Sequence, residues 1–153
     1  PNVMQGYRGP QEKTDKIQQN GWYETGDIAK LAEDGFITIT GRLSRFSKIG
    51  GEMVPHEAIE QVLLESCADY SEPVIAVTSI PCERKGEKLI VLYAEALGDK
   101  EPLLESLKQS DIPNLWKPHH QSFYKIAKLP VLGTGKLDLK GIRTTAVEMA
   151  NRT

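Results

Sequence analysis

The chain has 153 residues and nearly balanced charge, with 19 Lys and Arg against 21 Asp and Glu and a formal net charge of −2 at pH 7. This length suffices for one domain with an appendage, and the charge gives no reason to expect a nucleic-acid partner. Two cysteines, Cys67 and Cys82, predict no disulfide framework and favour reduced thiols, as in a cytosolic compartment. No apolar run is long enough to span a bilayer, and the start carries no signal-peptide pattern.

The first part of the chain predicts a polar opening segment followed by a β-hairpin. Because the chain starts at Pro1 rather than at a methionine, we expect it to be a piece of a longer protein. Residues 11–19 contain few apolar positions, and we expect this segment to be poorly ordered in isolation. Residues 22–31 predict one strand and residues 36–40 a second, joined by Asp34-Gly35, a pair that favours hairpin turns.

A basic, glycine-containing stretch at residues 41–55 separates this part from the rest of the chain. Its cations Arg42, Arg45 and Lys48 suit an anionic ligand. Gly50-Gly51 provides backbone freedom, including positive φ and close approach by another chain or a ligand. From these residues alone, a basic hairpin on a solvated surface is the simpler interpretation.

Helix and strand patterns alternate through the remainder of the chain. Apolar spacing predicts helices at 55–64, 99–110 and 139–149, and strands at 74–80, 88–96 and 121–126. We expect the strands to form a three-stranded antiparallel sheet, with the hairpin beside it and the helices laid on one side. This arrangement is an α+β sandwich.

Several residues in this part have competing interpretations. His56, at the start of the first helix, is expected to be exposed rather than catalytic, because no triad partners cluster with it. The adjacent pair His119-His120 does not have the spacing of zinc ligands. Trp116 is either an anchor in the core or part of a partner surface. The loop containing Lys136 is not a P-loop, because Leu137 stands where that motif needs Ser or Thr.

Four short blocks occur in order along the chain: Gly21-Trp22-Tyr23-x-Thr25-Gly26-Asp27, Gly41-Arg42, Lys48-x-x-Gly51 and Pro130-x-x-x-x-Gly135-Lys136. Their order and spacing resemble those of the adenylate-forming enzymes, which include acyl- and aryl-CoA synthetases, peptide-synthetase adenylation domains and luciferases. Such enzymes use ATP to activate a carboxylate as an acyl-adenylate and then pass the acyl group to a thiol. The resemblance covers nearly the whole chain. It implies a strand-rich tail of the large N-terminal domain at 1–43 and a small mobile C-terminal lid at 44–153.

The resemblance assigns nucleotide-binding roles to Asp27 and Arg42. Asp27 would hold the ribose hydroxyls, and an ionised carboxylate can accept two hydrogen bonds from a diol. Arg42 would reach the ribose or a phosphate. The alternatives are an aspartate that closes a turn beside Gly26 and an exposed surface arginine.

The same resemblance assigns four residues to the lid. Lys136 is the catalytic residue, bridging the substrate carboxylate and the α-phosphate, on both of which negative charge develops. Ser44 falls at the hinge, where related enzymes have Asp or Lys, so no charge is available there to latch either orientation. Lys48 and Gly51 would act in a second, thioester-forming orientation, with Gly51 giving a pantetheine arm a wall without a Cβ. For Lys48 and Lys136 the alternative is an exposed lysine.

Residues 114–118 and 129–140 look closest to a bacterial group of bifunctional acyl-[acyl-carrier-protein] synthetases and 2-acylglycerophosphoethanolamine acyltransferases. This likeness implies a fatty acid substrate, the phosphopantetheine thiol of acyl carrier protein as acceptor, and lysophospholipid reacylation by a separate domain. The parent would be cytoplasmic or attached to the bacterial inner membrane through its other parts. The alternatives are a fatty acyl-CoA synthetase, with CoA as acceptor, and a non-catalytic module that docks a carrier protein. ATP and Mg²⁺ would be bound mainly by the N-terminal domain, so we expect the isolated 153 residues to be inactive.

Overall fold

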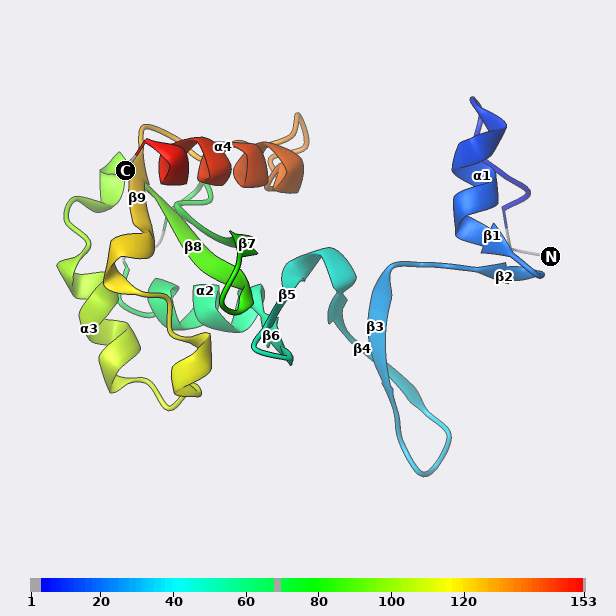
Figure 1. Ribbon diagram of the computed structural model, residues 1–153, viewed down its shortest axis with the longest axis horizontal. Helices are drawn as coiled ribbons and strands as arrows, with labels where there is room; N and C mark the ends of the chain where they lie inside the picture. Colours follow the sequence, from blue (N-terminus) through cyan, green and yellow to red (C-terminus); the bar gives the residue numbers. More distant parts are fainter. Residues whose placement is uncertain (1–3, 68–69, 153) are drawn as a thin grey trace. The chain divides into compact units, whose positions relative to one another are not determined.

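The computed structural model describes residues 4–67 and 70–152. The chain folds into two compact units, Pro1–Leu43 and Ser44–Thr153, each with its own set of helices and strands (Figure 1).

The first unit consists of a short helix and two antiparallel strand pairs. Its elements are α1 (Gln11–Ile17), β1 (Gln18–Gln19), β2 (Trp22–Tyr23), β3 (Asp27–Leu31) and β4 (Ile37–Arg42), with β1 paired to β2 and β3 to β4.

Two expectations for this unit were wrong. Residues 11–19 contain α1 and β1 instead of a poorly ordered segment, because the side chain of Thr14 is buried and accepts a hydrogen bond from the Tyr7 amide at 3.0 Å. Residues 22–31 do not form one strand, because the backbone turns at Gly26, whose φ is +72°. The predicted hairpin is present, with the Ala32 amide donating to the Phe36 carbonyl at 2.9 Å.

The second unit starts with a 3₁₀ turn that straddles the boundary between the units. Its elements are η1 (Leu43–Arg45), β5 (Phe46–Ile49), β6 (Glu52–Pro55), α2 (His56–Leu64), β7 (Ile75–Cys82), β8 (Gly86–Ala94), η2 (Glu95–Leu97), α3 (Glu101–Gln109), η3 (Asn114–Trp116), η4 (His120–Ser122), β9 (Phe123–Ile126) and α4 (Leu139–Asn151).

The sheet of this unit is larger than predicted and is mixed. Its order is β6-β5-β8-β7, with β9 also paired to β8, which gives five strands in place of three. The hairpin β5–β6 joins the sheet through a single residue pair, Ile49 with Gly86. Strand β9 runs parallel to β8 because the long connection through α3 returns the chain to the starting end. The fold is nevertheless α+β, as expected.

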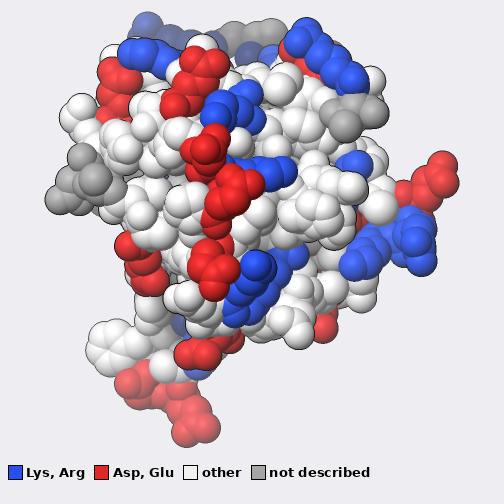
Figure 2. Space-filling view, turned by 90° about the vertical axis from the view of Figure 1, so that its left-hand side faces the viewer, with Lys and Arg blue, Asp and Glu red and all other residues white. Residues whose placement is uncertain are grey.

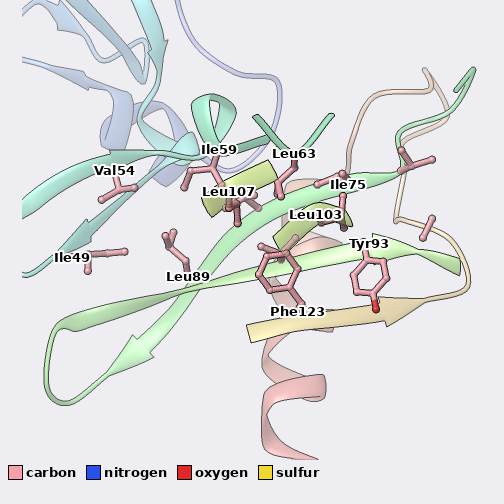
Figure 3. Close-up of a cluster of buried hydrophobic side chains, with 14 residues drawn as sticks. Ile49, Val54, Ile59, Leu63, Ile75, Leu89, Tyr93, Leu103, Leu107 and Phe123 are labelled. Atoms are coloured by element: carbon pink, nitrogen blue, oxygen red, sulfur yellow. The ribbon is translucent and has the colours of Figure 1, made fainter. Parts of the chain in front are cut away.

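Helices cover both faces of the β7–β8 pair, which corrects the expectation of helices on one side. On one face, α2 and α3 pack against alternate residues of β7 and β8, as shown in Figure 3 for Ile59, Leu63, Leu103 and Leu107. On the other face, α4 packs against the intervening strand residues through Ile142, Ala146 and neighbours. Both faces of these strands are therefore apolar, and nearly continuous apolar runs are typical of strands covered on both sides.

Charged side chains of both signs are intermixed on the face shown in Figure 2, in keeping with the balanced composition. Across the described residues, no helix combines the length and apolar character needed to cross a membrane.

Candidate nucleotide-binding pair and catalytic loops

Asp27 and Arg42 lie opposite each other at the ends of β3 and β4. Arg42 Nε is 2.7 Å from Asp27 Oδ1, and the Arg42 side chain remains 65% exposed. The carbonyl of Thr25 also accepts a hydrogen bond from Arg42 Nη1, at 3.4 Å, and the Thr25 hydroxyl accepts one from the Asp27 amide at 3.0 Å. Cross-strand pairing thus brings together the two side chains that the resemblance assigned to one nucleotide.

Gly50 and Gly51 form the two-residue loop of the β5–β6 hairpin, here called the glycine turn. Their φ values are +58° and +94°. A two-residue loop with positive φ at both positions strongly favours glycine, so the turn itself accounts for these residues. A Cβ added to Gly51 would meet no atom within 4 Å among the described residues, so the backbone there is open to a ligand. The side chain of Lys48 is exposed beside this turn.

The glycine turn is fixed to the sheet by contacts that the sequence did not reveal. The Gly50 amide donates to the Lys85 carbonyl at 3.0 Å. The Lys48 amide donates to Glu87 Oε2 at 2.6 Å, and the Ser79 hydroxyl donates to Glu87 Oε1 at 2.8 Å. Glu87 lies between the two predicted strands 74–80 and 88–96, and no local pattern marks it as a partner of Lys48, 39 residues away.

Lys136 lies near the end of a tight turn at residues 131–137, here called the lysine loop. The loop is closed by a bridge between Val131 and Leu137 and by the Leu132 amide, which donates to the Lys136 carbonyl at 2.7 Å. Gly135 has φ +81°, which the turn requires. The Lys136 side chain is exposed, and within the described part of the chain its ammonium makes no hydrogen bond or ion pair. It is therefore free to meet an anion.

The lysine loop leads directly into α4 through an N-cap. The Asp138 carboxylate accepts hydrogen bonds from the amides of Lys140 and Gly141, both at 3.1 Å. The Asp138 amide in turn donates to the Pro130 carbonyl at 3.0 Å, which ties the two ends of the loop together. The loop that carries Lys136 is thus mounted on the start of a 13-residue helix.

The two loops lie near opposite ends of β8. The glycine turn is hydrogen bonded to residues 85–87, at the amino end. The base of the lysine loop, through Leu129 and Val131, lines a cavity together with Ala94 and Ala96, at and just beyond the carboxyl end. Strand β8 has nine residues. At about 3.3 Å per residue, its ends are roughly 26 Å apart.

A basic cleft of about 750 Å³ lies in the second unit near the glycine turn. Lys85, Lys88, Lys117 and His119 line it, together with the carboxylate residue Glu87. Apolar residues from β5, β8 and η3 and polar residues from η4 and β9 also line it. Cationic side chains around a partly apolar cleft suit a ligand that carries phosphate groups.

Arg45 does not belong to a ligand site, contrary to the sequence interpretation. It is buried, with its guanidinium paired to Glu60 and Nε 3.4 Å from Glu57 Oε1. Glu60 Oε1 also accepts a hydrogen bond from the Val77 amide at 2.7 Å. Burial raises the pKa of Glu60 above its ordinary value, although Arg45 and this amide act in the opposite direction. These contacts fix the start of the second unit onto α2 and β7.

His56 is buried, so the expectation of an exposed side chain was wrong. Its Nε2 lies 2.5 Å from Ser47 Oγ. Burial and the nearby Arg45 lower the pKa of His56 to about 4, against the opposing effect of Glu87. Although a serine beside a histidine can act in nucleophilic catalysis, these side chains are only 1% and 4% exposed. No substrate can reach them, and the pair is structural.

Trp116 is half-buried and packs against the α2–α3 side of the core, which fits the anchoring alternative. In the described ranges, no group of three or more His, Cys, Asp or Glu is arranged to hold a metal ion.

No protein-family model matches the chain. Among curated proteins, it is 39% identical over 153 residues to the putative acyl-CoA ligase YdaB of Bacillus subtilis, covering 96% of this chain and 28% of that protein. It is 30% identical over 142 residues to the medium-chain fatty-acid-CoA ligase of Escherichia coli, covering 90% of this chain and 24% of that protein. The chain therefore spans about a quarter of the length of these relatives.

Two solved structures have the same fold at 24% identity. ATP-bound MatB of Rhodopseudomonas palustris matches with a TM-score of 0.71, covering 97% of this chain and 29% of that one. The o-succinylbenzoate CoA synthetase MenE of Bacillus subtilis, in complex with its acyl-adenylate intermediate, matches with a TM-score of 0.70, covering 94% and 28%. The homologues and structural neighbours of this chain are thus AMP-binding acyl- and aryl-CoA ligases, and its α+β fold matches the C-terminal domain of adenylate-forming enzymes.

Proposed function

We propose that this chain is the C-terminal part of an ATP-dependent acyl ligase, which activates a fatty acid as an acyl-adenylate and transfers the acyl group to a thiol. The observation that carries the proposal is the location of the lysine loop and the glycine turn near opposite ends of β8. Two loops separated in this way are suited to serve two half-reactions in turn. The relatives support the substrate class, since one is a fatty-acid-CoA ligase.

In the adenylating orientation, Lys136 would contact the carboxylate and the α-phosphate. Its ammonium is exposed and carries a compact charge that can stabilise negative charge on both groups as the carboxylate attacks. Asp27 and Arg42 would hold the ribose. The ion pair between them would have to open, at least in part, for Asp27 to accept the ribose hydroxyls.

In the thioester-forming orientation, the glycine turn and Lys48 would face the acceptor. The open backbone at Gly51 would let a pantetheine arm pass. The change of orientation would occur at Ser44, which is exposed within η1 and adjoins the boundary between the two units. Arg45 is already held inside the second unit, so the bend would be confined to the residues before it.

CoA is the first candidate acceptor. The basic cleft supports it, because Lys85, Lys88 and Lys117 would complement the phosphates of a nucleotide. Acyl carrier protein, with lysophospholipid reacylation as the purpose, is the second candidate, and it is favoured by the likeness of residues 114–118 and 129–140 to that group. Mg²⁺ would accompany ATP, but the described residues offer no ligand cluster for it.

Acyl transfer by the full-length protein that contains this chain tests the proposal and its two acceptors. We expect fatty-acid-dependent exchange of pyrophosphate into ATP. We expect thioester formation with CoA to fall about tenfold in a Lys85→Ala, Lys88→Ala double variant, because one or two charge-assisted contacts are lost. Transfer to holo-acyl carrier protein and not to CoA would select the second candidate. Absence of fatty-acid-dependent exchange would contradict the proposal.

A further inference from the structure

We propose that Glu87 is a positioning residue for the thiol-accepting step, because its carboxylate holds the glycine turn in place. This inference rests on the proposed function of that turn. Although Glu87 also lines the basic cleft, in this proposal it touches neither the acyl group nor the thiol and acts on this step through the backbone of β5.

The carboxylate of Glu87 joins three strands. Oε2 accepts the Lys48 amide of β5 at 2.6 Å, and Oε1 accepts the Ser79 hydroxyl of β7 at 2.8 Å. Glu87 itself belongs to β8, which lies between them. Because β5 and β8 share only the pair Ile49–Gly86, the carboxylate supplies an attachment that a longer backbone ladder would otherwise provide.

The strength of this attachment follows from its chemistry and its setting. A hydrogen bond from an amide to a carboxylate is shorter and about twice as strong as one between neutral groups. The hydrogen bond from the Lys48 amide is exposed, but the bond from the buried Ser79 is partly buried, so both carboxylate oxygens are engaged and the carboxylate is oriented from two sides. The next amide on the same edge, that of Gly50, is held by the Lys85 carbonyl. The two acceptors, Lys85 and Glu87, lie in the β7–β8 turn and at the start of β8, respectively.

Loss of this anchor should affect only one half-reaction. The lysine loop lies near the other end of β8 and is closed by hydrogen bonds within residues 130–138, none of which involves Glu87. A loosened glycine turn would misplace the path of the acceptor arm, and small misplacements of a reacting group have large effects on rate.

Hydrogen exchange of the 153-residue chain tests the anchor without reference to any activity. In Glu87→Ala, we expect exchange of the Lys48 amide to accelerate by about tenfold or more, the loss of one hydrogen bond to a charged group. Exchange at Val91, in the middle of β8, should stay unchanged. Glu87→Gln keeps one acceptor oxygen and should give a smaller effect. Glu83→Ala, an exposed carboxylate in the same turn, is the matched control and should change neither amide. An unchanged rate at Lys48 in both Glu87 variants, or an equal rise at Val91, would overturn the anchoring.

The positioning role is tested in the full-length protein with the same variants. Glu87→Ala should reduce thioester formation from supplied acyl-adenylate by about tenfold or more and leave pyrophosphate exchange within about twofold. Equal losses in both assays would refute the role. If the unmodified protein transferred no acyl group to either acceptor, the proposed function would fail, whereas the exchange result at Lys48 would still decide the anchor.

Discussion

The imidazole of His56 is held neutral in the folded protein. It is enclosed by the core, it meets the Ser47 hydroxyl, and the charges nearest to it are those of Arg45 and Glu87. Because protonation would place a second cation near Arg45 without access to water, the neutral form is strongly preferred.

This preference predicts that the chain loses stability on mild acidification. The folded-state pKa of His56, about 4, is below the ordinary value of 6.5. The neutral imidazole of His56 therefore contributes about 3 kcal/mol to the free energy of unfolding above pH 6.5. This contribution is lost as the pH falls from 6.5 toward 4. Burial of Glu60 acts in the opposite sense, because its raised pKa favours proton uptake by the folded state. Urea midpoints measured between pH 7 and pH 4.5 check the prediction.

His56→Gln is the informative comparison, because glutamine keeps a polar group near Ser47 but does not titrate. We expect its urea midpoint to depend less on pH than that of the unmodified chain. Identical pH profiles for the two proteins would show that another group controls acid stability.

Some side-chain pairings could be predicted from the sequence and others could not. The Asp27–Arg42 pair could be anticipated, because the hairpin between them fixes the register that brings them together. The burial of Arg45 and His56 could not, because their partners Glu60 and Ser47 are fifteen and nine residues away and become partners only when α2 packs on the hairpin. An arginine in a basic stretch is predicted to be exposed unless the carboxylate that pairs with it is known.

Among the elements, α4 has a role beyond packing, because its N-cap also closes the lysine loop. Asp138→Ala would leave the amides of Lys140 and Gly141 without this acceptor. We expect it to lower the free energy of unfolding by about 1 kcal/mol. Asp138→Asn keeps a hydrogen-bond acceptor and should lower the free energy of unfolding by less. Urea denaturation of the three proteins measures the difference, and equal effects of Ala and Asn would contradict the capping role.

Helices α2, α3 and α4 and most strands were predictable, because apolar spacing alone distinguishes these helices from β7 and β8, whereas α1 lacks such spacing and was missed. The sheet was not predictable. The pairing of β9 with β8 depends on where the connection through α3 returns the chain, and the single-residue join of β5 to β8 at Gly86 depends on the connection through α2 and β7. No local pattern encodes either return. The two short strands β2 and β3 were merged in the prediction because the turn at Gly26 contains only one glycine.

At the scale of the whole molecule, the two units differ in how they are stabilised. Both clusters of buried apolar side chains found among the described residues belong to the second unit. In the first unit, the hairpin exposes Phe36, Ile37 and Ile39 by 66–74%. Apolar side chains exposed close together are typical of a surface that takes part in an interaction.

The second unit has its own apolar core, and Arg45 is held inside it. In the proposed mechanism, this unit would therefore rotate as a rigid body about the residues that precede Arg45. The lysine loop and the glycine turn, at opposite ends of β8, would then serve different steps. The two half-reactions of the proposed function can be assayed separately, so the assignment of each loop to one of them is directly measurable.

The most direct test is Lys136→Ala in the full-length protein, compared with Lys140→Ala, an exposed lysine in the next turn. We predict that Lys136→Ala lowers fatty-acid-dependent pyrophosphate exchange by about a hundredfold or more, the typical effect of removing a group that stabilises transition-state charge. Thioester formation from supplied acyl-adenylate should be retained, and Lys140→Ala should change neither reaction. Equal loss of both half-reactions in Lys136→Ala would contradict the account.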